Sequence, residues 1–403
     1  MTTLHDPDRW ADRWRERFPI LERSTYLVTH SLGAMPRAVY GKLQAFADQW
    51  ATRGVRAWAE GWWDAPVSVG EQVAQLLHAP PGTVVMHQNV SMIQSIIASA
   101  LDFGGKRNKI VYSEQEFPSV MYVWEALRRV GARIECVRGD AVGVADERLI
   151  EAIDEETRLV PISHVCFRTS FLQDARAICA RAREVGALVL LDCYQSLGTV
   201  PIDVQELGVD MVCGGSVKWL CGGPGAAYLY VRPGLLEELE PRVTGWAAHA
   251  SPFAFETGEQ RYAEGARRLL NGTPAVAALL TATAGYETVL EVGVENIRRH
   301  SIALTERLRQ DLAARGFTSP SPADPARRGG TLTVALRADE SGPAFVKALA
   351  QRDILVDYRP GAGIRVSPHF YTRASELERF VAALVELRER RTWTEHVERV
   401  AVY

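Results

Sequence analysis

The chain has 403 residues, of which 47% are hydrophobic and 24% are charged, and its formal net charge at pH 7 is -3. A charge so close to zero argues against a domain that coats nucleic acid or an anionic membrane through bulk electrostatics. The composition is that of an ordinary globular protein, and at about 150 residues per domain the length predicts two or three domains.

The pattern of cysteines and the N-terminal sequence indicate the cellular compartment. The six cysteines are scattered through the middle of the chain and form no Cys-x-x-Cys pair. The first residues lack the basic and then apolar pattern of a signal peptide, and no stretch approaches the roughly 20 apolar residues that span a bilayer. We therefore expect a cytoplasmic chain with reduced cysteines and no membrane partner.

Three kinds of segment follow one another along the chain. The first 80 or so residues have a helical pattern and many tryptophans, which we expect to pack in a core or a subunit interface. Short β-rich runs then alternate with helical ones, and strands are predicted at 84–87, 109–112, 133–137, 159–164, 187–192, 209–213 and 226–231. Such alternation is typical of a mainly parallel sheet covered by helices, whose ligands bind at the carboxyl ends of the strands.

The chain changes character after residues 271–274. Long helices are predicted over about 275–314, short strands near 331–336, 354–358 and 363–366, and a closing helix over 375–391. These elements predict a smaller C-terminal α+β lobe. We divide the chain into residues 1–35, which join the small lobe, a large domain at 36–290 and a small domain at 291–403.

One pair of residues in the large domain has the character of a catalytic site. Asp192 ends an apolar strand, and Lys218 lies between Gly214-Gly215 and Gly222-Gly223 with apolar neighbours. A lysine among apolar groups has a lowered pKa and can act as a neutral nucleophile. An amine and an acid at neighbouring strand ends suit pyridoxal phosphate, although the spacing alone is equally compatible with a turn lysine and a helix-capping aspartate. The nine histidines form no metal-ligand cluster in the sequence, so we expect no metal.

Motifs spread over nearly the whole chain strengthen the pyridoxal phosphate interpretation. They are, in order, 26–36 (YLVTHSLGAMP), 116–118 (EFP), 163–169 (SHVCFRT), 192–201 (DCYQSLGTVP), 218–225 (KWLCGGPG), 245–246 (GW), 271–274 (NGTP) and 363–371 (GIRVSPHFY). In this order and spacing the chain resembles the fold-type-I pyridoxal phosphate enzymes of the class V aminotransferase group, and kynureninases most of all. The resemblance implies a seven-stranded, mainly parallel sheet with a smaller C-terminal lobe.

The resemblance also assigns the residues that hold the cofactor. It implies that Lys218 forms the Schiff base, that Asp192 pairs with the pyridine nitrogen, and that Phe117 stacks on the ring. The expected phosphate ligands are, from the start of a helix, Asn89, Val90 and Ser91, together with the indole of Trp246 and, from a second subunit, Thr273. Arg365 is the expected partner of the substrate α-carboxylate, because a guanidinium matches a carboxylate in a bidentate manner. Ser91, Trp246 and Thr273 also have structural interpretations, as helix caps or core.

Several positions depart from the kynureninase pattern. The family tyrosine before the lysine is Val217, the family histidine three residues after the aspartate is Gln195, and the asparagine of the N-terminal turn is His30. Gln195 stays a candidate cofactor contact. Ser216 is a candidate replacement for a lost phosphate contact, and His30 is a candidate catalytic and substrate-binding group. Loss of a positioned acid typically lowers a rate by about 10²–10⁴, so efficient kynurenine hydrolysis is not expected.

The function predicted from this resemblance is that of a lyase. It would cleave the Cβ–S or Cβ–C bond of an amino-acid-like substrate in specialised metabolism, as a homodimer. An aminotransferase or a decarboxylating deaminase is the alternative. A non-catalytic regulatory protein is disfavoured because both Lys218 and Asp192 are present. We expect a small-molecule substrate and no nucleic-acid partner.

Overall fold

The large lobe is built on one central sheet. The computed structural model describes residues 6–140 and 142–397. Seven strands lie in the order β2-β8-β7-β6-β5-β3-β4. They are β2 (Val84–His87), β8 (Ala227–Val231), β7 (Met211–Gly215), β6 (Leu188–Asp192), β5 (Thr157–Ser163), β3 (Lys109–Ser113) and β4 (Arg133–Val137). Only β8 runs antiparallel to its neighbours within this described sheet. The predicted mainly parallel seven-stranded sheet is therefore confirmed.

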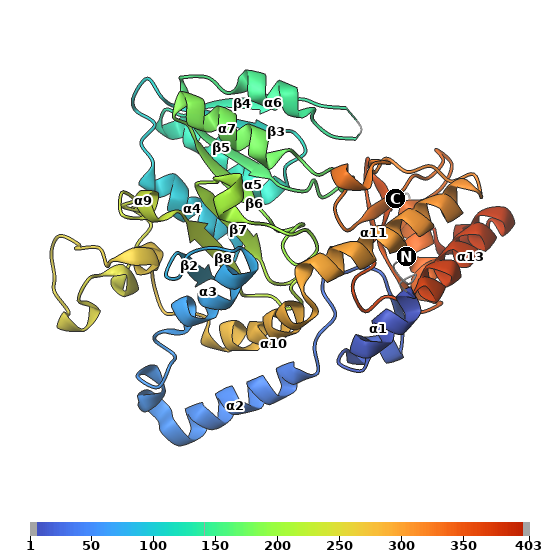
Figure 1. The fold of residues 1–403 in the computed structure, drawn as a ribbon, viewed down its shortest axis with the longest axis horizontal. Helices are drawn as coiled ribbons and strands as arrows, with labels where there is room; N and C mark the ends of the chain where they lie inside the picture. Colours follow the sequence, from blue (N-terminus) through green and yellow to red (C-terminus); the bar gives the residue numbers. More distant parts are fainter. Residues whose placement is uncertain (1–5, 141, 398–403) are drawn as a thin grey trace, which may run out of the picture.

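Helices cover both faces of this sheet, as its apolar strands require (Figure 1). On β3, Ile110 and Tyr112 face one hydrophobic core and Val111 faces the other, following the two-residue period of a strand. The first core includes α4 (Val90–Ala100), α5 (Pro118–Ala126) and α9 (Pro233–Leu236). The second includes α3 (Ala65–Leu76), α6 (Asp146–Ala152), α7 (Ala175–Val185), α8 (Val204–Leu207) and α10 (Val276–Val292).

The smaller lobe has a core of its own. A three-stranded antiparallel sheet in the order β11-β12-β9 packs with three helices around this core. The elements are α11 (Val294–Ala313), β9 (Leu332–Val334), α12 (Gly342–Ala350), β11 (Asp357–Arg359), β12 (Gly363–Val366) and α13 (Ala374–Arg390). The long helices predicted over 275–314 are α10 and α11, and Gly293, which adopts a positive φ of 81°, separates them.

The N-terminal segment packs on the small lobe. Helix α1 (Pro7–Arg15) contacts α11 and α13, and β1 (Thr25–Tyr26) pairs in parallel with β10 (Ile354–Leu355). Helix α1 therefore lies beside α13, close to the other end of the described chain (Figure 1). The residues that follow β1 cross from the small lobe to the large lobe close to the carboxyl ends of the central strands.

Helix α2 (Ala38–Arg53) is unusual because none of its residues is buried. It extends along the outside of the large lobe beneath α10 (Figure 1). Its large apolar side chains Tyr40, Leu43 and Trp50 are exposed. None of the helices in the described ranges has the length and apolar character needed to cross a membrane.

Candidate active site

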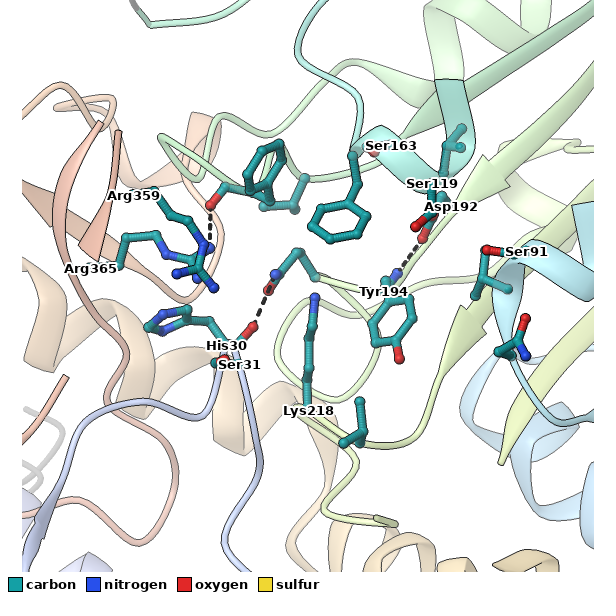
Figure 2. A pocket seen from close by; sticks show the side chains of 18 residues that line it. His30, Ser31, Ser91, Ser119, Ser163, Asp192, Tyr194, Lys218, Arg359 and Arg365 are labelled. Atoms are coloured by element: carbon teal, nitrogen blue, oxygen red, sulfur yellow. Dashed lines mark hydrogen bonds between the residues drawn. The ribbon is translucent and has the colours of Figure 1, made fainter. Parts of the chain in front are cut away.

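A cavity of about 350 Å³ lies at the carboxyl ends of the central strands, between the two lobes. Its walls include Asp192 and Lys218 from the large lobe, His30 from the N-terminal segment, and Arg359 and Arg365 from the small lobe. Figure 2 shows these side chains converging on the space around the Lys218 amine. The structure thus brings together residues that are far apart in the sequence.

Lys218 lies on the turn that follows β7. Its Nζ is 4.2 Å from the centre of the Tyr194 ring and 5.9 Å from that of Phe117. Burial lowers the pKa of this amine, and Arg365 and Arg359 lower it further, while Asp192 opposes them. A lowered pKa increases the fraction of neutral amine, which is the nucleophilic form.

The N-terminal segment contacts the lysine turn directly at Gly33. The Gly33 amide donates a hydrogen bond to the carbonyl of Val217 at 2.7 Å. A Cβ at position 33 would lie 2.1 Å from the carbonyl oxygen of Lys218. Only glycine therefore permits this close approach of the two backbones.

Asp192 is buried at the end of β6, where parallel pairing sets it beside Ser163 of β5 and Cys213 of β7. Its Oδ1 accepts a hydrogen bond from the Tyr194 amide at 2.9 Å. Burial raises the pKa of this carboxyl, while the Tyr194 amide and Lys218 act in the opposite direction. A cationic ring nitrogen placed here would favour the carboxylate, because an opposite charge stabilises it.

A second buried acid, Glu116, lies behind Ser163, which lines the cavity. Glu116 accepts hydrogen bonds from the Ser113 hydroxyl at 2.8 Å and from the Ser163 amide and hydroxyl at 2.7 and 2.5 Å. Burial raises the pKa of Glu116 to about 7, and Asp192 adds to this, although the serine hydrogen bonds oppose it. The sequence showed Glu116 only as part of a motif, and gave no sign of this environment.

The residues expected to bind a phosphate lie at the start of α4. Asn89 is the N-cap, and its Oδ1 accepts a hydrogen bond from the Met92 amide at 2.9 Å. Asn89, Val90 and Ser91 all line the cavity. The positive end of a helix dipole and the amides of its first turn favour an anion. Together with a lysine of lowered pKa and a buried acid, these groups fit the chemistry of pyridoxal phosphate.

Arg365 lies on β12 opposite the large lobe, and its guanidinium is already paired with a carboxylate. Its Nε and Nη2 donate to the two oxygens of Asp357 at 2.8 and 2.6 Å, and its Nη1 donates to the carbonyl of Phe167 at 2.8 Å. Asp357 stands directly opposite Arg365 in the β11–β12 hairpin. Because a guanidinium has five N–H groups, these three hydrogen bonds use three of them and leave two.

His30 is held between the two lobes. Its Nε2 is 2.8 Å from Asp357 Oδ1, and its Nδ1 is 2.7 Å from the hydroxyl of Ser367. Burial lowers the pKa of His30 to about 4, and Arg365 contributes to the same shift. With both ring nitrogens bonded to protein groups, the histidine has no free nitrogen for a substrate proton, and this arrangement favours a positioning role.

Gln195 lines the cavity and connects it to the core. Its amide nitrogen donates to the His30 carbonyl at 3.1 Å, and its oxygen accepts from the Trp219 indole at 3.0 Å. Both ends of the side chain are therefore engaged by protein groups. Phe117 also lines the cavity and is 45% exposed, so part of its side chain is accessible to a bound group.

Three predicted site residues lie away from this cavity. The hydroxyl of Ser216 is buried against the hydroxyl of Tyr286, and Ser216 does not line the cavity. Trp246 and Thr273 line a different cavity of about 460 Å³, and the Trp246 indole donates to the carbonyl of Pro252. A single chain does not place these three side chains in the wall of the cavity around Lys218.

The site also contains five residues to which the sequence assigned no role: Tyr194, Glu116, Ser163, Asp357 and Arg359. Tyr194 lies within the motif that begins at Asp192, which offered a signal. Asp357 and Arg359 are charged residues on the strand before Arg365, but their relevance depends on the register of the hairpin.

The comparisons with known proteins agree with this geometry. A model of the family "Aminotransferase class-V" matches residues 25–380. The chain belongs to this family. A kynureninase from Pseudomonas fluorescens is 31% identical over 94% of this chain and 93% of its own length. An uncharacterised aminotransferase of Bacillus subtilis, YcbU, is also 31% identical, over 91% of this chain and 95% of its own.

Solved structures show the same fold. The apo cysteine desulfurase of Thermococcus onnurineus NA1 aligns with a TM-score of 0.85 over 97% of this chain and all of that chain, at 20% identity. A mutant of C-DES, with glycine covalently linked to its pyridoxal phosphate cofactor, aligns with a TM-score of 0.84 over 92% and 99%, at 22% identity. The predicted family and fold are therefore confirmed, and the predicted cofactor agrees with them.

Proposed function

We propose that this protein is a pyridoxal phosphate-dependent lyase that cleaves the Cβ–S or Cβ–C bond of an amino-acid-like substrate. The observation that carries the proposal is the placement of Lys218 and Asp192 in one cavity with Arg365 and the start of α4. The names of relatives support the type of reaction, because one is a kynureninase and a structural neighbour is a cystine C–S lyase.

Each part of the cavity has a separate task. When bound, pyridoxal phosphate supplies an electron sink that stabilises negative charge at the substrate Cα. Lys218 holds the cofactor covalently, Asp192 holds its ring nitrogen protonated, and the first turn of α4 binds its phosphate. Arg365 orients the substrate through its α-carboxylate, using the N–H groups that Asp357 and Phe167 leave free.

Proton transfer at Cα is assigned to Lys218. The free Nζ has a lowered pKa, so it would be able to accept the Cα proton of a substrate held beside it near neutral pH. His30 orients Asp357 and the N-terminal segment rather than contacting the substrate, because both of its ring nitrogens are hydrogen-bonded to protein groups.

An aminotransferase, or a decarboxylating deaminase, is the second candidate. The Bacillus subtilis relative bears the name of an aminotransferase, and a carboxylate site at Arg365 serves these reactions equally well. Hydrolysis of kynurenine is disfavoured because Val217 and Gln195 replace the tyrosine and histidine of the family pattern.

We further propose that the protein acts as a homodimer, with Thr273 supplied to the site of the partner. The second cavity, which Thr273 and Trp246 line, also has Trp58, Trp63 and Phe253 in its walls. Trp246 and Phe253 are 44% and 60% exposed, and α2 buries none of its residues. An apolar surface of this kind is typical of an interface. The cytoplasmic location stays a prediction.

The first experiment tests the cofactor. The wild-type protein mixed with pyridoxal phosphate should show the visible absorbance of a lysine-bound cofactor. Lys218→Ala should lose it, and Lys106→Ala, at an exposed lysine outside the cavity, should retain it. Absorbance that survives in Lys218→Ala would refute the assignment.

The second experiment distinguishes the reactions. The holoenzyme is mixed with cysteine conjugates, kynurenine and simple amino acids, and the products and the cofactor spectrum are followed. Release of pyruvate from a cysteine conjugate supports β-elimination. Conversion of the cofactor to its amine form without release of pyruvate would instead support transamination.

A further inference from the structure

We propose that Arg359 is a second carboxylate-binding residue of this site, and that it acts together with Arg365 on one α-carboxylate. This inference rests on the proposed function, because it concerns the substrate of the same cavity. Arg359 lies two residues after Asp357 on β11 and lines the cavity beside Arg365 (Figure 2).

The two guanidinium groups converge on a single oxygen atom. Arg365 Nη2 is 2.6 Å from Oδ2 of Asp357, and Arg359 Nη2 is 3.1 Å from the same oxygen. Two arginines that share one carboxylate oxygen are close enough to share another carboxylate that enters beside it. A planar guanidinium can contact two carboxylates along different edges, so Asp357 does not block either arginine completely.

The two arginines differ in how firmly they are held. The side chain of Arg365 is 3% exposed and donates three hydrogen bonds to Asp357 and Phe167. The side chain of Arg359 is 38% exposed, and besides its ion pair its one other hydrogen bond within the described ranges goes to the carbonyl of its neighbour Tyr358, at 2.9 Å. The hydrogen bonds of Arg365 therefore fix its side chain in place, whereas the side chain of Arg359 can turn toward an entering ligand.

The charges at this corner suit one carboxylate. Asp357 is ionised, because hydrogen bonds from His30 and Arg365 outweigh its burial and keep the pKa of its carboxyl well below the usual range. His30 is neutral near pH 7, since burial lowers its pKa to about 4. Two arginines and one aspartate leave a single positive charge, which a single α-carboxylate neutralises. The expected ligands are therefore amino acids with a free α-carboxylate, whereas esters and amines lack the recognised group.

Arg359 also lies within electrostatic reach of the reacting amine. Both Arg365 and Arg359 contribute to lowering the pKa of Lys218. A ligand carboxylate bound between the arginines would thus be held near the atom that carries the chemistry. This is the placement that an amino acid requires, because its carboxylate and its amine are attached to the same carbon.

The test uses two reagents that react with the lysine-bound cofactor and differ in a carboxylate. Aminooxyacetate carries one, and methoxyamine does not. The rate constants for loss of the visible absorbance are measured with wild-type holoenzyme, Arg359→Gln, Arg359→Lys and a control, Arg352→Gln. Arg352 lies on the same lobe outside the cavity, and its side chain is 32% exposed and ion-paired with Glu386.

We expect the wild type to prefer aminooxyacetate over methoxyamine. Arg359→Gln should reduce this preference by about 10-fold to 100-fold, the range of hydrogen bonds to charged groups, through the aminooxyacetate rate alone. The preference of Arg359→Lys for aminooxyacetate should lie between those of the wild type and Arg359→Gln. The preference of Arg352→Gln should equal that of the wild type. An Arg359→Gln variant with the wild-type preference would overturn the proposal, and so would equal slowing of both reagents, which indicates a structural role.

Failure of the proposed function gives a different result. If the wild-type protein forms no lysine-bound cofactor, neither reagent changes the spectrum and the whole assignment is lost. If the absorbance forms and Arg365→Gln, but not Arg359→Gln, removes the preference, the cofactor site stands and the carboxylate is bound by one arginine.

Discussion

Substitution of Glu116 by glutamine should make the protein more stable above neutral pH. Burial raises the pKa of this carboxyl from its ordinary value of 4.5 to about 7, and no described cation forms an ion pair with it. The native state therefore binds the Glu116 proton more tightly than the unfolded state does. Between pH 4.5 and 7 the contribution of Glu116 to stability decreases as the pH rises, because the ionised form must be kept in a buried site.

The size of the effect follows from this shift. A change from 4.5 to about 7 corresponds to about 3 kcal/mol at 1.36 kcal/mol per pH unit, and the whole amount is lost above pH 7. Glutamine has the shape of the protonated acid. Its oxygen can accept from the amide and hydroxyl of Ser163, and its nitrogen can donate to the Ser113 hydroxyl, in place of the contacts that Glu116 makes.

The assay is urea-induced unfolding at several pH values between 4.5 and 8, with the same cofactor concentration throughout. Glu116→Gln and the wild type should have similar stability near pH 4.5, and the variant should gain up to about 3 kcal/mol at pH 8. Glu155→Gln, at an exposed acid, should follow the wild type at every pH. If Glu116→Gln lowers stability equally at pH 5 and pH 8, Glu116 is an ionised acceptor and the reasoning is wrong.

Two further substitutions test the lysine turn and the interface. Gly33→Ala should lower stability by about 1–3 kcal/mol and perturb the cofactor absorbance, because the new Cβ would overlap the Lys218 carbonyl oxygen. Gly41→Ala, on exposed α2 with no neighbour near its Cβ position, should instead be neutral or gain up to about 1 kcal/mol, and equal thermal midpoints for the two variants would contradict this. Phe253→Glu should convert the proposed dimer to monomers in sedimentation, while Tyr122→Glu, at a residue 72% exposed outside both cavities, should not. A dimer that survives Phe253→Glu would exclude this surface as the interface.

The fold was largely predictable because its strands are apolar runs at regular spacing. The predicted strand 187–192 is Leu188–Asp192, so Asp192 ends its strand as expected. The strand predicted at 209–213 is Met211–Gly215, two residues later. Gly214 and Gly215 have little strand propensity, so the sequence did not indicate that they pair with Tyr228 and Ala227 of β8. That shift brings the end of β7 closer to Lys218.

The parts of the site that were not predicted depend on side-chain direction and register. Ser216 follows β7 directly, and its sequence position alone does not show that its hydroxyl turns to Tyr286 on α10. Asp357 becomes a partner of Arg365 only through the β11–β12 register, which brings together two residues eight positions apart. Trp246 and Thr273 share a second cavity, which no local pattern shows.

The hydrogen bonds around His30 limit how the two lobes can move. The carbonyl of His30 accepts from Gln195 of the large lobe, whereas its ring is bonded to Ser367 and Asp357 of the small lobe. A rigid-body opening of the small lobe would have to break either the hydrogen bond from Gln195 to the His30 carbonyl or the bonds of the His30 ring to Ser367 and Asp357. All of these bonds lie within or beside the cavity. Arg365 shares Asp357 with His30, so its position relative to Lys218 is set by the same contacts. Adjustment to a ligand at this corner must therefore come from a side chain held less firmly than these, and Arg359 has that freedom.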